Sequence, residues 1–327
     1  MREKFRRADV ALCLLPHHRL IAIPKLMRTA LVVPWSQPMI SSAVRTGTLL
    51  ICAVATSIAS AQIANIVVTS ASTFETGMPP QGSIASVFCT GLTHATGVVA
   101  APGSPLPYEL AGVRVSVDGA DAPIFAVAAS SGFQQINIQV PLEAQFESSA
   151  EGSFVTIQIH SSEGSGSARV SLRDTPGDFF RFENSAGLFQ RAEDYSVITD
   201  NNAARPGEYV VGYLTGLPSA QPPVPTGQVT PLEPLSIVPQ TQRDTDAGWD
   251  RYTISVGGEI TTPTFLGLAP GYVGVYQVNF IVPAFTPSGV VQVVLQRDRC
   301  VAFFGSCING GGMRHQTASS PATIVIR

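Results

Sequence analysis

Two stretches of this 327-residue chain carry the same pattern. Residues 134–141 read QQINIQVP and residues 276–283 read YQVNFIVP, so that Gln-apolar-Asn-x-x-Val-Pro returns 142 residues later, from Gln135 to Gln277. A catalytic motif is normally used once in an active site, whereas a pattern that recurs at a long interval usually marks a repeated structural unit. The pattern therefore predicts two copies of one fold.

Three further blocks return in the same order. SIASVFCTGL (83–92) precedes EYVVGYLTGL (208–217), VRVSVDGADAPIF precedes YTISVGGEITTPTF, and VTIQI precedes VVQVVLQ. The second copy carries extra loop, mostly the Pro-rich segment after Leu217. We expect one domain over 62–173 and a second over 174–327.

Each motif is interpreted as a late strand with one apolar and one polar face. Side chains alternate along a strand, so the predicted buried positions are Ile136, Ile138 and Val140 in the first copy and Val278, Phe280 and Val282 in the second. Gln135, Asn137 and Gln139 share the other face. Pro141 and Pro283 are expected to end the strands because Pro cannot donate to the ladder. Asn is a poor mid-strand residue, so Asn137 and Asn279 are predicted to bond the backbone of a neighbouring loop.

The rest of the chain has the composition of an all-β protein. Short β-branched runs alternate with turns, the chain contains 29 Gly and 25 Pro, and no long amphipathic helix is predicted after residue 62. Asp118-Gly119 and the segment HSSEGSGSA indicate tight hairpins. The sequence predicts two tandem immunoglobulin-like antiparallel β-sandwiches after a signal peptide, without the Cys…Trp…Cys core of antibody domains.

The N-terminal segment 1–61 is interpreted as an extension and a secretory signal peptide. The apolar run GTLLICAVATSIASA follows Arg45 and ends in the small-x-small pattern Ala59-Ser60-Ala61. A membrane anchor is the alternative, although a spanning helix needs about 20 apolar residues. Because residues 1–38 are not needed by a signal peptide, the true start is predicted at Met39.

Charge limits the partners of the exported chain. After cleavage 12 basic and 21 acidic residues remain, and the 12 basic residues are scattered arginines. No basic stripe can neutralise a phosphate backbone, so nucleic acid is excluded as a partner. We expect no stable membrane insertion after cleavage.

The residues also resemble a known family. PLPYELAGVRVSVDGADAPIF, QINIQVP, ARPGEYVVGYLTGL and GLAPGYVGVYQVNFIVP are similar to the uncharacterised C-terminal domain family of Solibacter-type soil bacteria, over nearly the whole exported chain. The sequence departs from the family in ASSGFQQ and in the insertion RDRCVAFFGSCINGGGMRHQ. The resemblance implies an extracellular pair of Ig-like domains and supplies no catalytic residue.

Candidate chemistry is sparse. Cys300 and Cys307 enclose VAFFGS and are a candidate disulfide in an oxidising compartment, whereas Cys89 is interpreted as a buried small hydrophobe. His94, His160 and His315 stand beside no nucleophile motif. No cofactor is expected, except that calcium could bind the alternating carboxylates of DTDAGWD; a solvated acidic loop is the alternative. Those carboxylates are Asp244, Asp246 and Asp250.

Aromatic side chains could form a stacking surface for a sugar, although packing in the core is the alternative. The candidates are Tyr108, Trp249, Tyr272 and Tyr276. The leading functional hypothesis is a secreted, non-enzymatic module for cell-surface or extracellular adhesion, with an extracellular protein or a glycan as partner. A structural spacer without a ligand and a secreted hydrolase with an unfamiliar site are the alternatives.

Overall fold

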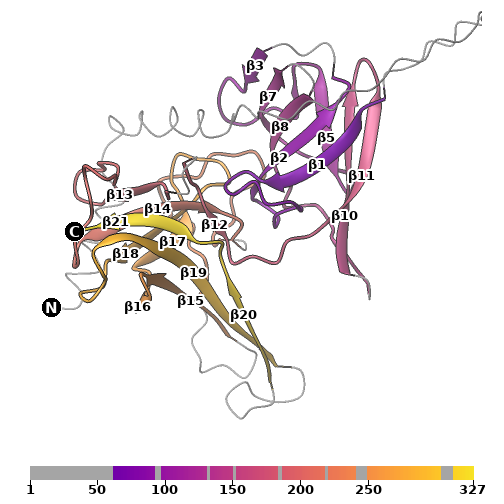
Figure 1. Ribbon diagram of the computed structural model, residues 1–327. Coiled ribbons are helices and arrows are strands. Elements are labelled where there is room, and N and C mark those ends of the chain that lie inside the picture. The colour runs from indigo at the N-terminus through magenta and orange to yellow at the C-terminus, as the bar shows by residue number, and fades with distance from the viewer. Residues whose placement is uncertain are drawn as a thin grey trace, which may run out of the picture.

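The computed structural model of the protein describes residues 62–92, 97–130, 133–149, 152–182, 186–217, 220–240, 249–302 and 312–327. Within these ranges every regular element is a β-strand (Figure 1). No helix in them is long and apolar enough to cross a membrane. Segment 1–61, where the signal peptide and the start at Met39 are predicted, lies outside the described residues.

The first sandwich has two sheets. The strands of one sheet, in spatial order, are β1 (Ala64–Ser70), β2 (Ile84–Thr90), β8 (Phe133–Gln139), β7 (Ile124–Ser130) and β3 (Gly97–Ala100). The strands of the other are β11 (Ser165–Ser171), β10 (Gly152–Ser161), β5 (Val113–Val117) and β4 (Glu109–Leu110), with β6 (Ala120–Asp121) on β5 and β9 (Glu147–Ser149) on β10. The pairings between these strands are antiparallel.

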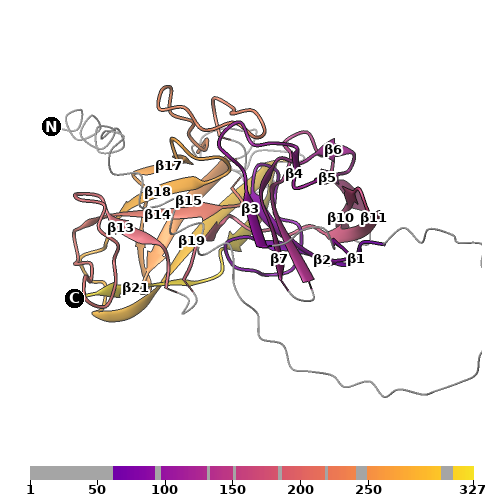
Figure 2. The ribbon, with the colours of Figure 1, turned by 90° about the horizontal axis from the view of Figure 1, so that it is seen from above.

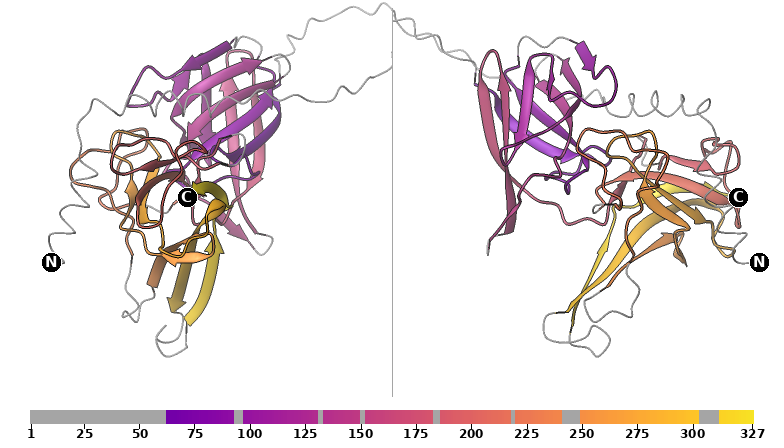
Figure 3. Two further views of the ribbon diagram at one scale, coloured as in Figure 1. Left: turned by 60° about the vertical axis from the view of Figure 1, so that its left-hand side comes forward. Right: turned by 180° about the vertical axis from the view of Figure 1, so that it is seen from behind.

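The second sandwich also has two antiparallel sheets. One contains β12 (Asp178–Phe179), β14 (Tyr209–Thr215), β18 (Tyr276–Ile281) and β17 (Phe265–Leu268), with β13 (Phe189–Arg191) on β14. The other contains β16 (Glu259–Thr261), β15 (Trp249–Val256), β19 (Gly289–Ala302) and β20 (Gly312–Ala318), with β21 (Ala322–Ile326) on β19. Figure 3 shows the two sandwiches as separate bodies that touch along one side.

The two sandwiches share their strand order. β2-β8-β7 in the first corresponds to β14-β18-β17 in the second, and β10-β5-β6 corresponds to β19-β15-β16. The predicted fold class, all-β with two Ig-like antiparallel sandwiches, is confirmed. The domain boundary at 173/174 stays a prediction.

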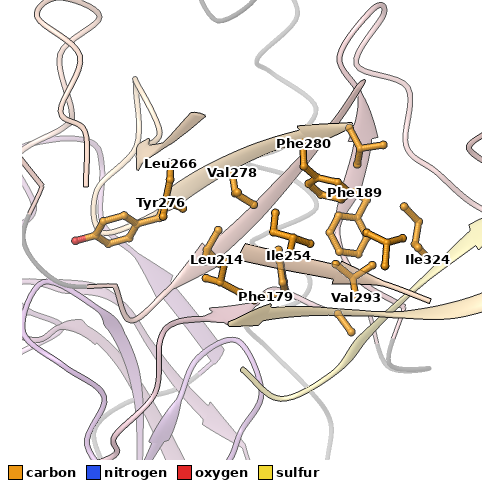
Figure 4. Packing of buried hydrophobic residues seen from close by; sticks show 14 of the residues in the cluster. Phe179, Phe189, Leu214, Ile254, Leu266, Tyr276, Val278, Phe280, Val293 and Ile324 are labelled. Carbon is orange, nitrogen blue, oxygen red and sulfur yellow. The ribbon is translucent and has the colours of Figure 1, made fainter. Parts of the chain in front are cut away.

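Each sandwich has its own hydrophobic core between its sheets. The first core gathers aliphatic side chains such as Val87, Ile136 and Ile157. The second is built around aromatic rings, in which Phe189 packs against Phe179 and Phe280 with ring centroids 5.2 Å and 6.1 Å apart (Figure 4). Burial of these apolar surfaces supplies most of the driving force for folding each sandwich.

The two Gln-Asn motifs lie on equivalent central strands, as the alternation predicts. All six predicted core positions are fully buried, and β8 and β18 end at Gln139 and Ile281, two residues before the motif prolines. The polar faces of both strands are buried as well. Polar side chains in such a place need partners.

Side chains of the sheet supply partners for both asparagines, and bonding to a loop backbone stays a prediction. The Asn137 amide oxygen accepts hydrogen bonds from Gln135 Nε2 and Ser86 Oγ, both at 2.9 Å. In the second sandwich, Gln277 Nε2 donates to Asn279 Oδ1 at 2.8 Å. The Gln lies two residues before the Asn and therefore on the same face of the strand. The motif thus encodes a side-chain bond within the sheet, which the prediction missed.

Both predicted hairpins are present. Asp118 and Gly119 join β5 to β6 with positive φ at both residues, as a two-residue type I′ turn requires. Gly257 and Gly258 occupy the equivalent turn between β15 and β16. β10 and β11 form the second predicted hairpin.

A third apolar cluster joins the two sandwiches. Val211 and Tyr213, on the face of β14 that points away from its own core, pack in one cluster with Ile84 and Ala71 of the first sandwich. Thr215 Oγ1 accepts a hydrogen bond from the backbone N–H of Ile84 at 2.9 Å. Figure 2 shows the first sandwich against the end of the second that carries this contact. The sandwiches are therefore docked through buried surface and are not connected by a linker alone.

Candidate functional site

The candidate site is a polar pocket on one sheet of the second sandwich. β19 is 14 residues long. In Figure 1, β15, β19 and β20 extend beyond the rest of the second sandwich. The pocket has a volume of about 410 Å³. Its principal lining residues, which define what we call the sheet pocket, are Arg251, Thr253, Ile260, Gln296, Asp298 and Gln316.

Strand register brings these residues onto one face. Arg251 and Thr253 of β15 lie opposite Asp298 and Gln296 of β19, and Asp298 in turn lies opposite Gln316 of β20. Residues i and i+2 of a strand point to the same side. One row of polar side chains therefore crosses all three strands, and a second row, Thr253 with Gln296, crosses β15 and β19.

The sheet pocket offers several kinds of contact. Thr253 Oγ1 donates to Gln296 Oε1 at 3.4 Å, which orients that amide. Asp298 Oδ1 is buried and has no hydrogen-bond partner among the described residues. Ile260 is 56% exposed at the edge of the pocket. The arrangement provides an acceptor, a cation, amide groups and an apolar contact, which together suit recognition of a partner surface better than a single chemical reaction.

On the opposite face of the same strands, Arg297 and Asp250 form an ion pair. Arg297 donates from Nε to Asp250 Oδ1 at 2.7 Å and from Nη2 to Asp250 Oδ2, and its guanidinium lies over the Tyr252 ring. The hydrogen bond with Asp250 raises the pKa of Arg297 in spite of its partial burial. A bidentate pair of this kind fixes both partners in one geometry.

This pair bears on the calcium prediction. Asp244 and Asp246 lie outside the described residues, and both carboxylate oxygens of Asp250 are engaged by Arg297. In the part of the chain that the structure describes, no group of three His, Cys, Asp or Glu side chains could hold a metal ion. The calcium site stays a prediction for the DTDAGWD segment.

The three predicted stacking aromatics whose side chains are described do not form one exposed surface. Tyr108 is exposed, whereas Tyr276 is buried in the core of the second sandwich and is no stacking surface. Tyr272 is partly buried against the cluster between the sandwiches, and burial raises the pKa of its hydroxyl to about 12. The side chain of Trp249 lies outside the described residues.

The cysteines divide into two kinds. Cys89 is a free, buried thiol of the first core, as predicted, and burial raises its pKa to about 12. A protonated buried thiol is a poor nucleophile. Cys300 is disulfide-bonded. Its predicted partner, Cys307, lies outside the described residues, so the pairing stays a prediction.

The histidines form no common site among the described residues. His160 is an exposed residue of β10, and His315 Nε2 lies 3.7 Å from Asp174 Oδ2, with both side chains exposed. His94 lies outside the described residues.

Sequence reasoning missed the sheet pocket. The signal available was the alternation of polar and apolar residues in RYTIS together with the polar run QRDR at residues 296–299. The Ser86–Asn137 hydrogen bond joins residues about fifty positions apart, whereas the Gln–Asn bond within each motif joins residues two positions apart on one face of a strand.

Comparisons with known proteins leave the family open. No family model matches the chain, and no curated protein matches it. Among solved structures, the chain is similar to SGBP-B of the Bacteroides ovatus mixed-linkage glucan utilization locus, solved in complex with a mixed-linkage heptasaccharide. The TM-score is 0.26 at 10% identity, over 76% of this chain and 42% of that one. The chain thus matches less than half of that protein's length.

A second similar structure is the C-terminal domain of the Streptococcus pyogenes antigen I/II-family protein AspA, with a TM-score of 0.17 at 11% identity over 81% of this chain and 99% of that one. The corresponding domain of BspA from Streptococcus agalactiae gives 0.15 and 10% with the same coverage. At these values the similarities carry no argument about ligand or activity. The resemblance to the Solibacter-type family stays a prediction.

Proposed function

We propose that this protein is a secreted, non-enzymatic binding module that mediates adhesion outside the cell, with the sheet pocket as its contact surface. The observation that carries the proposal is the double row of polar side chains on β15, β19 and β20. Arg251 and Asp298 stand opposite each other in the middle of this surface, so charges of both signs are available to a partner.

The chemistry of the pocket favours a protein partner. A protein surface supplies both a carboxylate for Arg251 and a donor for the unpartnered oxygen of Asp298, and apolar side chains for exposed Ile260. Complementary charges mainly set specificity and the rate of encounter. The hydroxyls of a neutral glycan could hydrogen-bond to both groups, but a glycan of this kind offers no opposite charge to either.

Screening on an array of extracellular proteins and glycans tests this function. Wild type is expected to bind protein spots, and the double variant Arg251→Ala/Gln316→Ala is expected to lose that binding at least tenfold. The matched control is Arg169→Ala, which removes an exposed arginine from β11 of the first sandwich and should bind like wild type. Binding to glycans alone, or binding that the double variant retains, would contradict the proposal.

A structural spacer is the second candidate, and the docking of the sandwiches favours it. The backbone N–H groups of Ile84 and Leu106 in the first sandwich donate to Thr215 Oγ1 and the Gly227 carbonyl in the second. Such contacts suit a rigid rod-like unit. An array without any ligand, together with a small-angle scattering profile of one rigid shape, would favour the spacer.

A further inference from the structure

A second cavity lies between the two sandwiches and shares no lining residue with the sheet pocket. Its volume is about 340 Å³, which falls in the range of about 300–1,000 Å³ that small-molecule sites occupy. Gln81 and Gln139 line it from the first sandwich, and Gln221 and Gln228 line it from the Pro-rich loop of the second. We call it the interdomain cavity.

The described lining of the interdomain cavity is a mixture of polar and apolar groups and is uncharged. The polar side chains on its described walls are the four glutamines, Thr230 and Tyr276, and none of the described lining residues carries a charge. Leu142, Val224 and Leu268 supply apolar wall. An ion that entered would lose its hydration without gaining an opposite charge, so the cavity selects against charged ligands.

Hydrogen bonds across the boundary hold the cavity open before any ligand arrives. Gln139 Nε2 donates to the Gly82 carbonyl at 3.3 Å, while Gln139 Oε1 accepts from the backbone N–H of Gly227 at 2.7 Å. Val229 donates its backbone N–H to Ser104 Oγ at 3.0 Å. The loop of the second sandwich is thereby fixed against the first, and a preformed site costs little ordering on binding.

One group on the cavity wall lacks a partner. Thr230 is 2% exposed, it lines the cavity, and its hydroxyl forms no hydrogen bond with any described residue. A buried hydroxyl without a partner is costly. A ligand hydroxyl placed beside Thr230 would supply the missing hydrogen bond.

From these observations we infer that the interdomain cavity binds a neutral sugar, either free or as the terminal residue of a glycan. The amides of Gln221 and Gln228 can both donate and accept, as sugar hydroxyls do, whereas those of Gln81 and Gln139 also form hydrogen bonds within the protein. The apolar wall can pack against the C–H face of the ring. Because the walls come from both sandwiches, the bound sugar also stabilises their docked arrangement. The inference does not depend on the function proposed for the sheet pocket.

Calorimetric titration and thermal melting of the full chain test the inference. The probes are glucose, galactose, mannose and N-acetylglucosamine, with glucuronic acid and glucosamine as charged comparisons. At least one neutral sugar is expected to bind and to raise the Tm, and its charged analogue is expected to bind roughly tenfold more weakly. Methyl glycosides and short oligosaccharides distinguish a free sugar from the terminal residue of a glycan. A site for the terminal residue binds them, and a site for a free sugar does not. No binding by any neutral sugar at concentrations up to about 100 mM would overturn the inference.

Two variants separate binding from folding. Thr230→Val keeps the shape and removes the unpartnered hydroxyl, so the sugar affinity is expected to fall roughly three- to tenfold while the Tm of the sugar-free protein stays unchanged or rises. Gln228→Leu changes an exposed residue of the rim and should weaken binding without loss of folding. Arg251→Ala, in the sheet pocket, should leave sugar binding unchanged. Equal affinity in wild type and in both cavity variants would refute the assignment.

Discussion

The first and second sandwiches surround the same Gln-Asn pair differently. In the first, Ser86 of β2 lies opposite Asn137 and adds a second donor to its amide oxygen. In the second, Val211 of β14 takes that place opposite Asn279, and its side chain packs in the cluster that joins the sandwiches. One sandwich therefore uses this position for an internal polar network, and the other uses it for docking.

The cores differ in the same way. Val87 of β2 fills the first core, but the equivalent position on β14 is Gly212. A Cβ at Gly212 would meet the rings of Phe189 and Phe179 at 2.9 Å and 3.0 Å. Aromatic rings from β12 and β13 thus occupy the volume that the Val87 side chain fills in the first core. Shared strand order does not require shared packing, provided that total core volume is kept.

The largest expected difference concerns the two motif asparagines. Asn137→Leu removes the acceptor shared by Gln135 and Ser86, whereas Asn279→Leu removes the acceptor of Gln277. We expect the free energy of unfolding to fall by about 2–4 kcal/mol for Asn137→Leu and by about 1–3 kcal/mol for Asn279→Leu. Urea denaturation measures both.

Ser86→Ala is the control for the first of these variants. It removes only one of the two donors and should cost less than Asn137→Leu. If Asn279→Leu proved the more damaging of the two leucine variants, the account of the two networks would be wrong.

Core volume gives the next effect. Gly212→Val introduces into the second sandwich the side chain that the first sandwich has at Val87, and it should cost about 1–3 kcal/mol through crowding of Phe189 and Phe179. Adding Phe189→Leu should recover part of that loss. Thermal melting of the single and double variants checks this, and a double variant that is less stable than Gly212→Val alone would count against it.

A pH effect follows from the buried thiol of Cys89. The pKa of Cys89 is raised to about 12 by burial, above an unfolded value of about 8.5. Its contribution to stability is therefore complete below the unfolded pKa and is lost as pH rises toward the folded one. The second sandwich has Leu214 at this position.

Urea midpoints at two values of pH measure this contribution. Between about pH 8.5 and pH 10, wild type should lose about 1–2 kcal/mol more than Cys89→Val, which cannot ionise. The same loss in both proteins would show that Cys89 is not the titrating group.

The smallest effect lies in the equivalent hairpin turns. Asp118 occupies the first turn position in the first sandwich, and its Oδ1 accepts from the Thr156 backbone N–H at 2.7 Å. Gly257 stands there in the second, where a Cβ would lie 3.0 Å from Pro287. Gly257→Asn should cost about 1 kcal/mol, and Gly258→Asn, which faces open space, about half as much. Chemical denaturation that ranks them in reverse would contradict this view of the turns.

The fold could be predicted from local pattern. Strict alternation from Gln135 to Val140 fixes which side chains enter the core, because the period of a strand is two, and Asp118-Gly119 fixes its hairpin through the positive φ that the turn requires. The order of repeated blocks gave the strand correspondence. The alternation and the turn depend only on neighbours within a few residues.

The candidate site could not be predicted in this way. The sheet pocket depends on the register that sets Arg251 opposite Asp298, 47 residues later in the chain. The same holds for the burial of the polar face of β8, which depends on β2 and on the second sandwich. Tyr276 is the clearest example. From the local sequence, an aromatic residue after a Gly-rich turn suits a ligand surface as well as a core, and Tyr276 lies in the core.

The proposed function places binding on the long sheet of the second sandwich. Hydrogen–deuterium exchange of the full chain, with and without the partner found on the array, tests this most directly. The account predicts slower exchange in peptides from β15, β19 and β20, and no change in the equivalent strands β5, β10 and β11 of the first sandwich. Protection confined to the first sandwich would contradict it.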